Sequence, residues 1–216
     1  MTALVNHVLE WLYPPRCMVC EQLLPIRGSR WVCAEGCREL LSDAPEQEGG
    51  KNKAVFLYDD ILRTLLYRFK YGEHPEYGEG FAHLMAEKLG ADYFDNLQAD
   101  VLVPVPLHAK REKSRGYNQS VLLARHLGRL YNIPVEEKFI VRTRHTRAQS
   151  GLSPGERRQN IAGAFTLYKA KTPAGKHVVL VDDIFTTGAT LDACTALLIQ
   201  NEAEMVSSVT LSAAVL

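Results

Sequence analysis

The stretch VVLVDDIFTTGAT, residues 178–190, decides the fold class, because four aliphatic residues lead directly into two acids and a glycine loop. The aliphatic run predicts a buried strand that delivers Asp182 and Asp183 to the edge of a sheet where ligands bind. The loop after it predicts a helix N-terminus, whose free N–H groups and dipole favour a phosphate. Two acids suit vicinal hydroxyls or a hydrated divalent metal, so the whole stretch predicts a sugar-phosphate site. The plainer alternative, a buried strand before an N-capped helix, leaves the two acids unexplained.

Further strands and helices alternate along the chain. The runs ADVLVPVPLH and VSSVTLSAAVL are β-rich, whereas DDILRTLLYRFKYGE and NQSVLLARHLGRLY place apolar residues at helical spacing. A helix is also expected over GATLDACTALLIQN, with Cys194 as a small core residue. Continuous aliphatic strands between amphipathic helices predict an α/β domain with a mostly parallel sheet, flanked by helices on both faces.

Length and composition fit one such domain with a small appendage. The chain has 216 residues, of which 46% are hydrophobic and 23% charged. Its longest apolar runs are far shorter than the roughly 20 residues of a spanning helix, and the N-terminus lacks the basic start of a signal peptide. We therefore expect a cytoplasmic protein without membrane insertion. We expect residues 1–45 to form an N-terminal helix and a cysteine module, residues 54–216 to form the α/β domain, and residues 42–53 to be a polar linker or solvated connection.

Four cysteines near the N-terminus follow the spacing C-x2-C-x12-C-x3-C, at Cys17, Cys20, Cys33 and Cys37. Two such pairs of thiolates complete the tetrahedral all-sulfur site that zinc prefers. Four sulfur ligands leave no coordination position open for a substrate, so the spacing predicts structural zinc. Two disulfides are the alternative, and the lack of a secretion signal disfavours them because the cytoplasm is reducing.

The net charge of zero hides a basic middle segment. Residues 108–158 hold 12 Lys and Arg against 4 Asp and Glu, whereas residues 1–107 hold 10 against 16 and residues 159–216 hold 3 against 5. A segment with a net charge of +8 attracts phosphates, whether they are free or part of a nucleic-acid backbone. A solvated basic surface balanced by acids elsewhere is the simpler explanation, and the position of the segment in the fold decides between the two.

The strand, acid pair and loop of residues 178–190 resemble the 5-phosphoribosyl-1-pyrophosphate (PRPP) signature of type I phosphoribosyltransferases over thirteen consecutive positions. The resemblance implies that Asp182 and Asp183 contact the ribose hydroxyls and that Mg²⁺ accompanies PRPP. The residues that it implies for the 5′-phosphate are Thr186, Thr187, Gly188, Ala189 and Thr190. In the 6-oxopurine enzymes of this class a carboxylate stands where this chain has Thr186. A threonine cannot exchange a proton with a base at neutral pH, so hypoxanthine or guanine salvage is not expected.

Nearly the whole chain also resembles the ComF (ComFC) competence family, whose members take part in DNA uptake for transformation. The resemblance rests on PRCMVCEQ, VPVPLHAKREKSRGYNQS, RTRHTRAQSGLSPGERRQNIAGAF and the PRPP loop, in this order. It implies partners among other competence proteins, a pyrophosphate loop at VPVPLH and a mobile basic loop over residues 142–158. The residues implied for these two loops are Pro106, Leu107, His108, Arg115, Arg147 and Arg157. Asn118 and Gln119 fit either ligand contacts or helix caps.

Two functions are compatible with these patterns. In one, the protein is a PRPP-binding, non-catalytic factor of DNA uptake, and its basic segment binds single-stranded DNA. The DNA contacts expected are Lys110, Arg111, Lys113, Arg142 and Arg144. Single-strand binding also requires exposed aromatic rings, for which Tyr67, Tyr71 and Tyr117 are candidates, whereas Phe69 fits the core better. In the other, the protein is a Mg²⁺-dependent phosphoribosyltransferase that acts on an unidentified acceptor.

Overall fold

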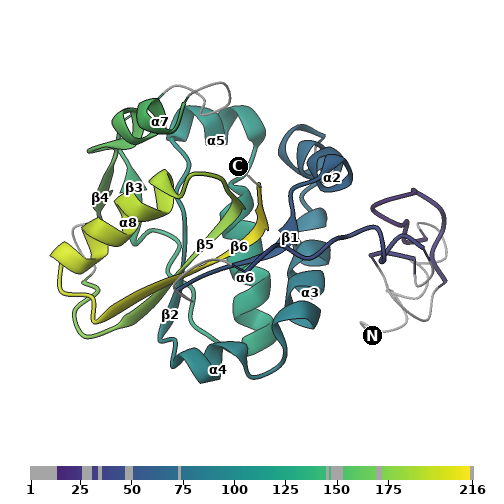
Figure 1. The fold of residues 1–216 in the computed structure, drawn as a ribbon, viewed down its shortest axis with the longest axis horizontal. Helices are drawn as coiled ribbons and strands as arrows, with labels where there is room; N and C mark the ends of the chain where they lie inside the picture. Colours follow the sequence, from purple (N-terminus) through teal and green to yellow (C-terminus); the bar gives the residue numbers. More distant parts are fainter. Residues whose placement is uncertain are drawn as a thin grey trace, which may run out of the picture.

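The centre of the fold is a four-stranded parallel sheet. The computed structural model describes residues 14–25, 31–33, 36–46, 51–72, 74–144, 146, 153–168 and 172–214. The sheet has the order β1-β6-β5-β2, and each neighbouring pair is parallel. Its strands are β1 (Asn52–Leu57), β2 (Val101–Pro104), β5 (His177–Phe185) and β6 (Met205–Ala213). The predicted α/β class with a mostly parallel sheet is confirmed (Figure 1).

Helices flank both faces of this sheet. The described helices are α2 (Asp60–Tyr71), α3 (Tyr77–Leu89), α4 (Tyr93–Leu97), α5 (Ala109–Arg115), α6 (Gln119–Tyr131), α7 (Pro154–Ile161) and α8 (Ala189–Gln200). The α3 and α6 helices pack together on one face, and α8 packs against β6 on the other. Among the described residues, no helix is both long and apolar enough to cross a membrane.

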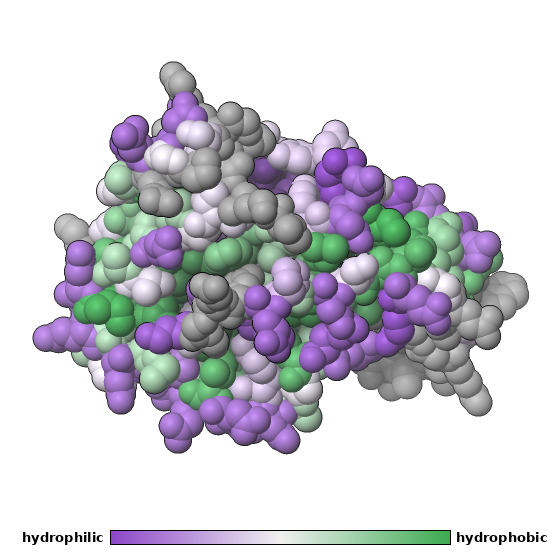
Figure 2. Space-filling model, in the orientation of Figure 1, coloured by the Kyte–Doolittle hydropathy of each residue, from purple (hydrophilic) through white to green (hydrophobic). Residues whose placement is uncertain are grey.

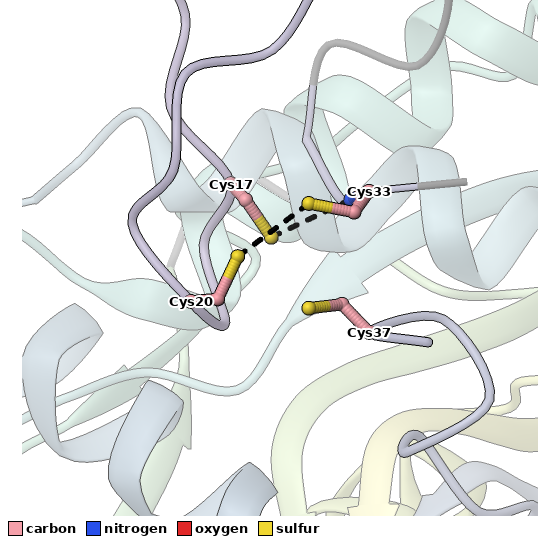
Figure 3. Close-up of side chains that lie close together, drawn as sticks. All are labelled: Cys17, Cys20, Cys33 and Cys37. Atoms are coloured by element: carbon pink, nitrogen blue, oxygen red, sulfur yellow. Dashed lines mark hydrogen bonds between the residues drawn. The ribbon is translucent and has the colours of Figure 1, made fainter. Parts of the chain in front are cut away.

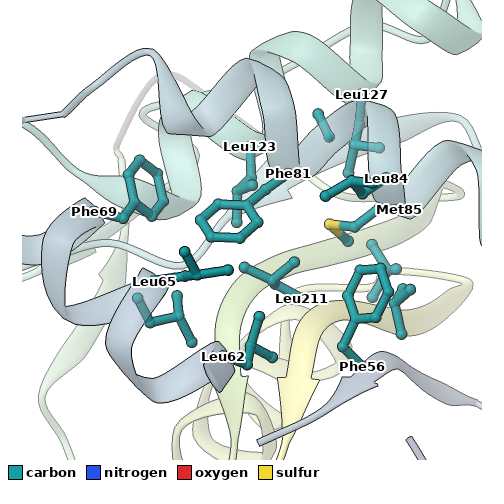
Figure 4. Close-up of a cluster of buried hydrophobic side chains, with 14 of the residues drawn as sticks. Phe56, Leu62, Leu65, Phe69, Phe81, Leu84, Met85, Leu123, Leu127 and Leu211 are labelled. Carbon is teal, nitrogen blue, oxygen red and sulfur yellow. The ribbon is translucent and has the colours of Figure 1, made fainter. Parts of the chain in front are cut away.

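Both faces of β5 are buried, which explains its unbroken aliphatic run. Val179 and Val181 join a core cluster with α2, α3 and α6, whereas Val178 and Leu180 join a second cluster with α8. Successive side chains of a strand point to opposite faces, so a strand covered on both sides needs apolar residues at every position. Figure 4 shows the first cluster, in which Phe81 lies between helices and sheet.

A small two-stranded antiparallel sheet is separate from the main sheet. It pairs β3 (Ile140–Arg142) with β4 (Phe165–Leu167), and α7 lies between these strands in the sequence. The mobile basic loop predicted over residues 142–158 therefore begins in β3 and ends inside α7. Residues 145 and 147–152 of that loop lie outside the described residues.

The cysteine module packs directly on the α/β part of the chain. Cys17 and Met18 belong to the same buried cluster as the residues of α2 and α3. Gly80 of α3 sits so close to the module that an added Cβ would lie 2.6 Å from Met18 Sδ and 2.8 Å from the ring of Trp31. In Figure 2, hydrophobic residues gather on the side of the molecule that carries this module. The helix predicted before the cysteines lies outside the described residues.

The segment predicted over residues 42–53 as a linker or solvated connection is exposed over most of residues 42–46, but it is not a free linker. Ser42 accepts a hydrogen bond from Leu57 N at 2.8 Å, and Ala44 donates to Val55 O at 3.0 Å, so this segment runs along β1. At the other end, β1 already begins at Asn52. The start of this edge strand was not predicted, because its first two residues are polar and burial begins only at its third residue.

Candidate functional site

The acid pair lies where β5 extends beyond its neighbour β2. The last register pair of β2 with β5 joins Pro104 to Val181. The next two residues of β5 are Asp182 and Asp183, and β5 continues to pair with β6 on its other side. Ligands of open parallel sheets bind beyond the carboxyl ends of the strands, at a position such as this one.

Each carboxylate is held by a defined partner. Asp182 Oδ1 accepts hydrogen bonds from Ser120 Oγ at 2.8 Å and from Asp183 N at 2.9 Å. Asp183 Oδ2 lies 2.8 Å from Lys70 Nζ, and both of these side chains are 16% exposed. Burial and then the charge of Asp183 raise the pKa of Asp182 to about 7, against the opposing hydrogen bond from Ser120. The folded protein thus makes this acid harder to ionise than an ordinary aspartate.

The glycine loop follows the acids directly and leads into α8. Gly188 has a φ of 74°, and it precedes the first residue of α8 as the N-cap. An added Cβ there would lie 3.3 Å from the ring of Phe185, so glycine fits both the conformation and the space. Thr186 and Thr190 line the same cleft as the acids. Thr187 Oγ1 is buried and has no hydrogen-bond partner among the described residues. The loop therefore offers hydroxyl and N–H donors at a helix N-terminus, the arrangement that suits a phosphate.

The acid pair, Thr186 and Thr190 open into one cleft of about 780 Å³. Its walls come from the acid pair, the segment after β2, α2, α5 and α6. In Figure 1, α5 and α2 flank the end of the sheet toward which β5 and β6 point. Pro106, Leu107 and Arg115, three of the residues implied for pyrophosphate, also line this cleft.

Two of the arginines that the sequence predicts as DNA contacts, Arg111 and Arg142, line the cleft. Arg142 is only 7% exposed and donates through Nη2 to Thr146 Oγ1, while its Nε has no partner in the described part of the chain. Arg111 Nη2 donates to Thr146 O at 2.9 Å. Burial lowers the pKa of both guanidinium groups. Buried cations without a carboxylate partner favour an anion beside them, and this burial makes Arg142 unsuitable as an exposed DNA contact.

The remaining basic residues lie in different surroundings. His108 caps α5, where its Nδ1 accepts from Lys110 N at 3.2 Å, and Lys110 and Lys113 are exposed on that helix. Arg144 Nη2 donates to Asn160 O at 2.9 Å and to Ala162 O at 2.7 Å, at the end of α7. Arg147 lies outside the described residues, as does the side chain of Arg157.

Asn118 and Gln119, which fit either helix caps or ligand contacts, both line the cleft at the start of α6. Asn118 is the N-cap of α6, because its Oδ1 accepts from Ser120 N at 3.0 Å, and its Nδ2 donates to Val105 O at 3.0 Å. Gln119 lines the cleft, and its buried Nε2 has no hydrogen-bond partner within the described residues. Sequence reasoning missed Lys70 and Ser120, the partners of the acid pair. No local pattern marks them, since each meets β5 only through the packing of its helix.

The four cysteines predicted for zinc come together in the N-terminal module. Their sulfur atoms all lie within 4.8 Å of one another, and none of them forms a disulfide. Figure 3 shows Cys17 and Cys20 from one loop facing Cys33 and Cys37. A hydrogen bond with Cys20 is the largest of the effects that raise the pKa of Cys33 to about 12, and burial chiefly raises that of Cys37 to about 11. A cation would offset the repulsion between four thiolates, and the donor set fits zinc.

Comparisons with known proteins give the family of this chain. The profile of the phosphoribosyl transferase domain matches residues 70–214. Competence protein F of Haemophilus influenzae is 35% identical over 168 residues, 76% of this chain and 72% of that protein. DNA utilization protein YhgH of Escherichia coli K12 is 36% identical over 152 residues, 69% of this chain and 66% of that protein. The solved hypoxanthine phosphoribosyl transferase of Trypanosoma cruzi aligns with a TM-score of 0.40 and 20% identity, over 63% of this chain and 64% of that chain. This chain belongs to the phosphoribosyl transferase domain family and, within it, to the family of competence protein F.

Proposed function

We propose that the protein binds PRPP, or a related ribose phosphate, and acts in DNA uptake for natural transformation. The observation that carries the proposal is the acid pair Asp182 and Asp183 beside the loop of residues 186–190 in one cleft. Carboxylates accept strong hydrogen bonds from ribose hydroxyls, and the N-terminus of α8 suits the 5′-phosphate. The kinship with competence protein F supports the role in DNA uptake.

Mg²⁺ is the cation that this site would take with PRPP. Asp182 and Asp183 would hold the ion, since Mg²⁺ prefers one or two carboxylates together with substrate phosphates. When bound, it neutralises part of the negative charge on the pyrophosphate group. Lys70 already pairs with Asp183 and so keeps the acid pair partly neutral without a ligand. Arg111 and Arg142 are the cations that we assign to pyrophosphate, because they lie along the cleft without a carboxylate partner among the described residues.

We also propose that single-stranded DNA binds along the outer face of α5. Lys110 and Lys113 are exposed there and are three residues apart, so they share one face of the helix. A strand that follows this face passes the mouth of the cleft, because Arg111, Ser114 and Arg115 of the same helix line it. We expect the protein to work in the cytoplasm beside other competence proteins, where its cysteines stay reduced.

Calorimetric titration of PRPP with and without Mg²⁺ tests the main proposal. We expect binding that requires Mg²⁺ and that is lost in the double variant Asp182→Asn, Asp183→Asn. The matched control is Asp95→Asn, which makes the same chemical change on exposed α4, outside the residues that line the cleft. Equal PRPP affinity in the double variant and in the wild-type protein would refute the assigned role of the acids.

A second candidate function is phosphoribosyl transfer to an acceptor. The observation that favours it is the size of the cleft, which extends from the acid pair past Gln119 to α2 and so leaves space for a second ligand. Thr186 stands where related purine enzymes have an acid, so an acceptor would have to react without that proton relay. Release of pyrophosphate from PRPP and Mg²⁺ only after addition of a nucleobase or an amine would support the enzyme.

A further inference from the structure

We propose that Tyr67 and Tyr71 form a stacking shelf for a nucleobase at the α2 side of the cleft. The inference deepens the proposed function and rests on it, because the shelf lies in the same cleft as the candidate ribose-phosphate site. It names the chemistry that the cleft would recognise beyond the sugar phosphate: a planar aromatic ring that carries hydrogen-bond acceptors.

The exposure of the two rings is the first observation. Tyr67 is 65% exposed and Tyr71 is 57% exposed, although both side chains line the cleft. Their ring centroids are 5.1 Å apart and their planes are tilted by 48°, so two aromatic faces lie side by side on adjacent turns of α2. The buried face of the same helix is formed by Leu62, Leu65, Leu66 and Phe69. The core is therefore complete without the tyrosines, and packing does not account for two adjacent exposed rings.

The second observation is that Arg115 of α5 holds the ring of Tyr71 in place. Arg115 Nη2 donates to the Tyr71 hydroxyl at 2.9 Å, and the guanidinium carbon lies 4.9 Å from the centre of the ring. The second terminal nitrogen of this group, Nη1, donates to Gln119 Oε1 at 3.1 Å. A chain of contacts thus links α2, α5 and α6. A ring whose position is fixed before binding loses little conformational entropy when a base stacks on it.

The third observation is an unused donor at the inner end of this chain. Gln119 is 1% exposed, and its Nε2 has no hydrogen-bond partner in the described residues, although the side chain lines the cleft. The hydrogen bond from Arg115 to Oε1 fixes the amide so that Nε2 is the free group. A buried donor without a partner is unfavourable, and a carbonyl oxygen or ring nitrogen of a ligand would satisfy it.

These three features select a nucleobase among planar ligands. A base has aromatic faces for the tyrosines and ring or carbonyl acceptors for Gln119 Nε2. The neighbouring acid pair and helix N-terminus suit ribose and phosphate, the other two parts of a nucleotide. The base can come from a free nucleotide or from a single strand that crosses the mouth of the cleft beside α5, and the experiment distinguishes these two sources.

The test compares ligands that differ only in their bases. Fluorescence anisotropy measures binding of a labelled mixed-sequence single strand and of an abasic strand of equal length to the full chain. We expect the abasic strand to bind more weakly. We expect the variant Tyr67→Ala, Tyr71→Ala to lose roughly 5- to 150-fold in affinity for the base-bearing strand, the range for loss of one stacked base. The same variant should bind the abasic strand with unchanged affinity, because its phosphates do not use the shelf.

Matched variants separate stacking from other effects. Tyr168→Ala removes a ring that is 49% exposed but lies outside the cleft, and it should leave both affinities unchanged. The variant Tyr67→Phe, Tyr71→Phe keeps the rings and should retain base-dependent binding. Thermal melting of every variant reports whether it is folded, and we expect little change because the rings are exposed.

Competition by deoxycytidine monophosphate that depends on the tyrosines would assign the shelf to free nucleotides. Its absence, with tyrosine-dependent binding of the strand, would assign the shelf to single strands.

Equal affinity of the wild-type protein for base-bearing and abasic strands, together with no tyrosine-dependent binding of the mononucleotide, would overturn the inference. So would a folded alanine variant that binds both base-bearing ligands as the wild-type protein does. PRPP titration of the wild-type protein is scored separately. Base-dependent binding without PRPP binding would refute the proposed ribose-phosphate site and leave the shelf intact. PRPP binding without base dependence would do the reverse.

Discussion

The buried carboxylate of Asp182 should destabilise the folded protein, and the variant Asp182→Asn tests this directly. In the folded protein the pKa of Asp182 rises from 3.8 to about 7, through burial and the charge of Asp183. Between these two pKa values the folded state holds a proton that the unfolded state has released, so the free energy of unfolding falls as pH rises through this window. Below the lower value the carboxyl is protonated in both states, and above the higher value the destabilisation is complete.

The size of the effect follows from the shift. One pKa unit corresponds to about 1.4 kcal/mol, so a shift of about 3 units destabilises the folded protein by at most about 4 kcal/mol above pH 7. Asparagine has no charge and escapes this effect. Relative to the wild-type protein, Asp182→Asn should therefore gain about 2 to 3 kcal/mol more at pH 8 than at pH 5, and less if Asp183 takes part of the shift.

Urea unfolding of the wild-type protein and of Asp182→Asn at pH 5 and pH 8 measures this difference. PRPP titration of the same samples at pH 8 should show that the more stable variant binds about 30-fold more weakly, corresponding to loss of about 2 kcal/mol from a charged hydrogen bond. A stability gain that is equal at the two pH values would refute the electrostatic reasoning. Undiminished PRPP affinity would refute the functional assignment of the acid.

Three further outcomes are expected. Elemental analysis should find one zinc per chain, and Cys17→Ser should lose the metal and lower the melting temperature, whereas metal-free wild-type protein would contradict the zinc assignment. By calorimetry, Arg142→Gln should weaken PRPP binding about tenfold through loss of a buried cation, while the exposed control Arg129→Gln should not, and equal effects would exclude a specific role. Substitution of Lys110 and Lys113 by Glu should reduce the slope of log affinity against log salt concentration for single-stranded DNA by about 1.4 or more. An unchanged slope would show that the DNA does not bind along α5.

The local patterns of the sequence predict the parts of the site that lie on one segment. The run from Val178 to Thr190 contains its strand, acids and loop in consecutive order, so the order alone places them together. The four cysteines follow in the same way from spacing on two turns. What these patterns share is that the backbone geometry of one or two short segments fixes the relative positions of their side chains.

Contacts between segments were not predictable in this way. Lys70 meets Asp183 only because α2 packs beside the end of β5, and periodicity identifies the buried face of a helix but not the partner of its polar side chains. In the sequence Arg142 is one more charge in a basic run, yet it is buried at the end of β3, where it pairs with Phe165 of β4. A net charge of +8 over residues 108–158 predicts an attraction for phosphates, but the fold decides which cations face the cleft and which face solvent.

The position of α2 connects the cysteine module with the acid pair. On one side of the helix, Arg68 forms an ion pair with Glu21 over 2.7 Å and donates to Met18 O at 3.4 Å, both in the module. Two residues further along, Lys70 pairs with Asp183 over 2.8 Å. The module therefore braces the helix that holds the acid pair and carries the exposed tyrosines. Because a structural metal stabilises the segment that binds it, zinc at the four cysteines would fix one wall of the cleft without taking part in its chemistry.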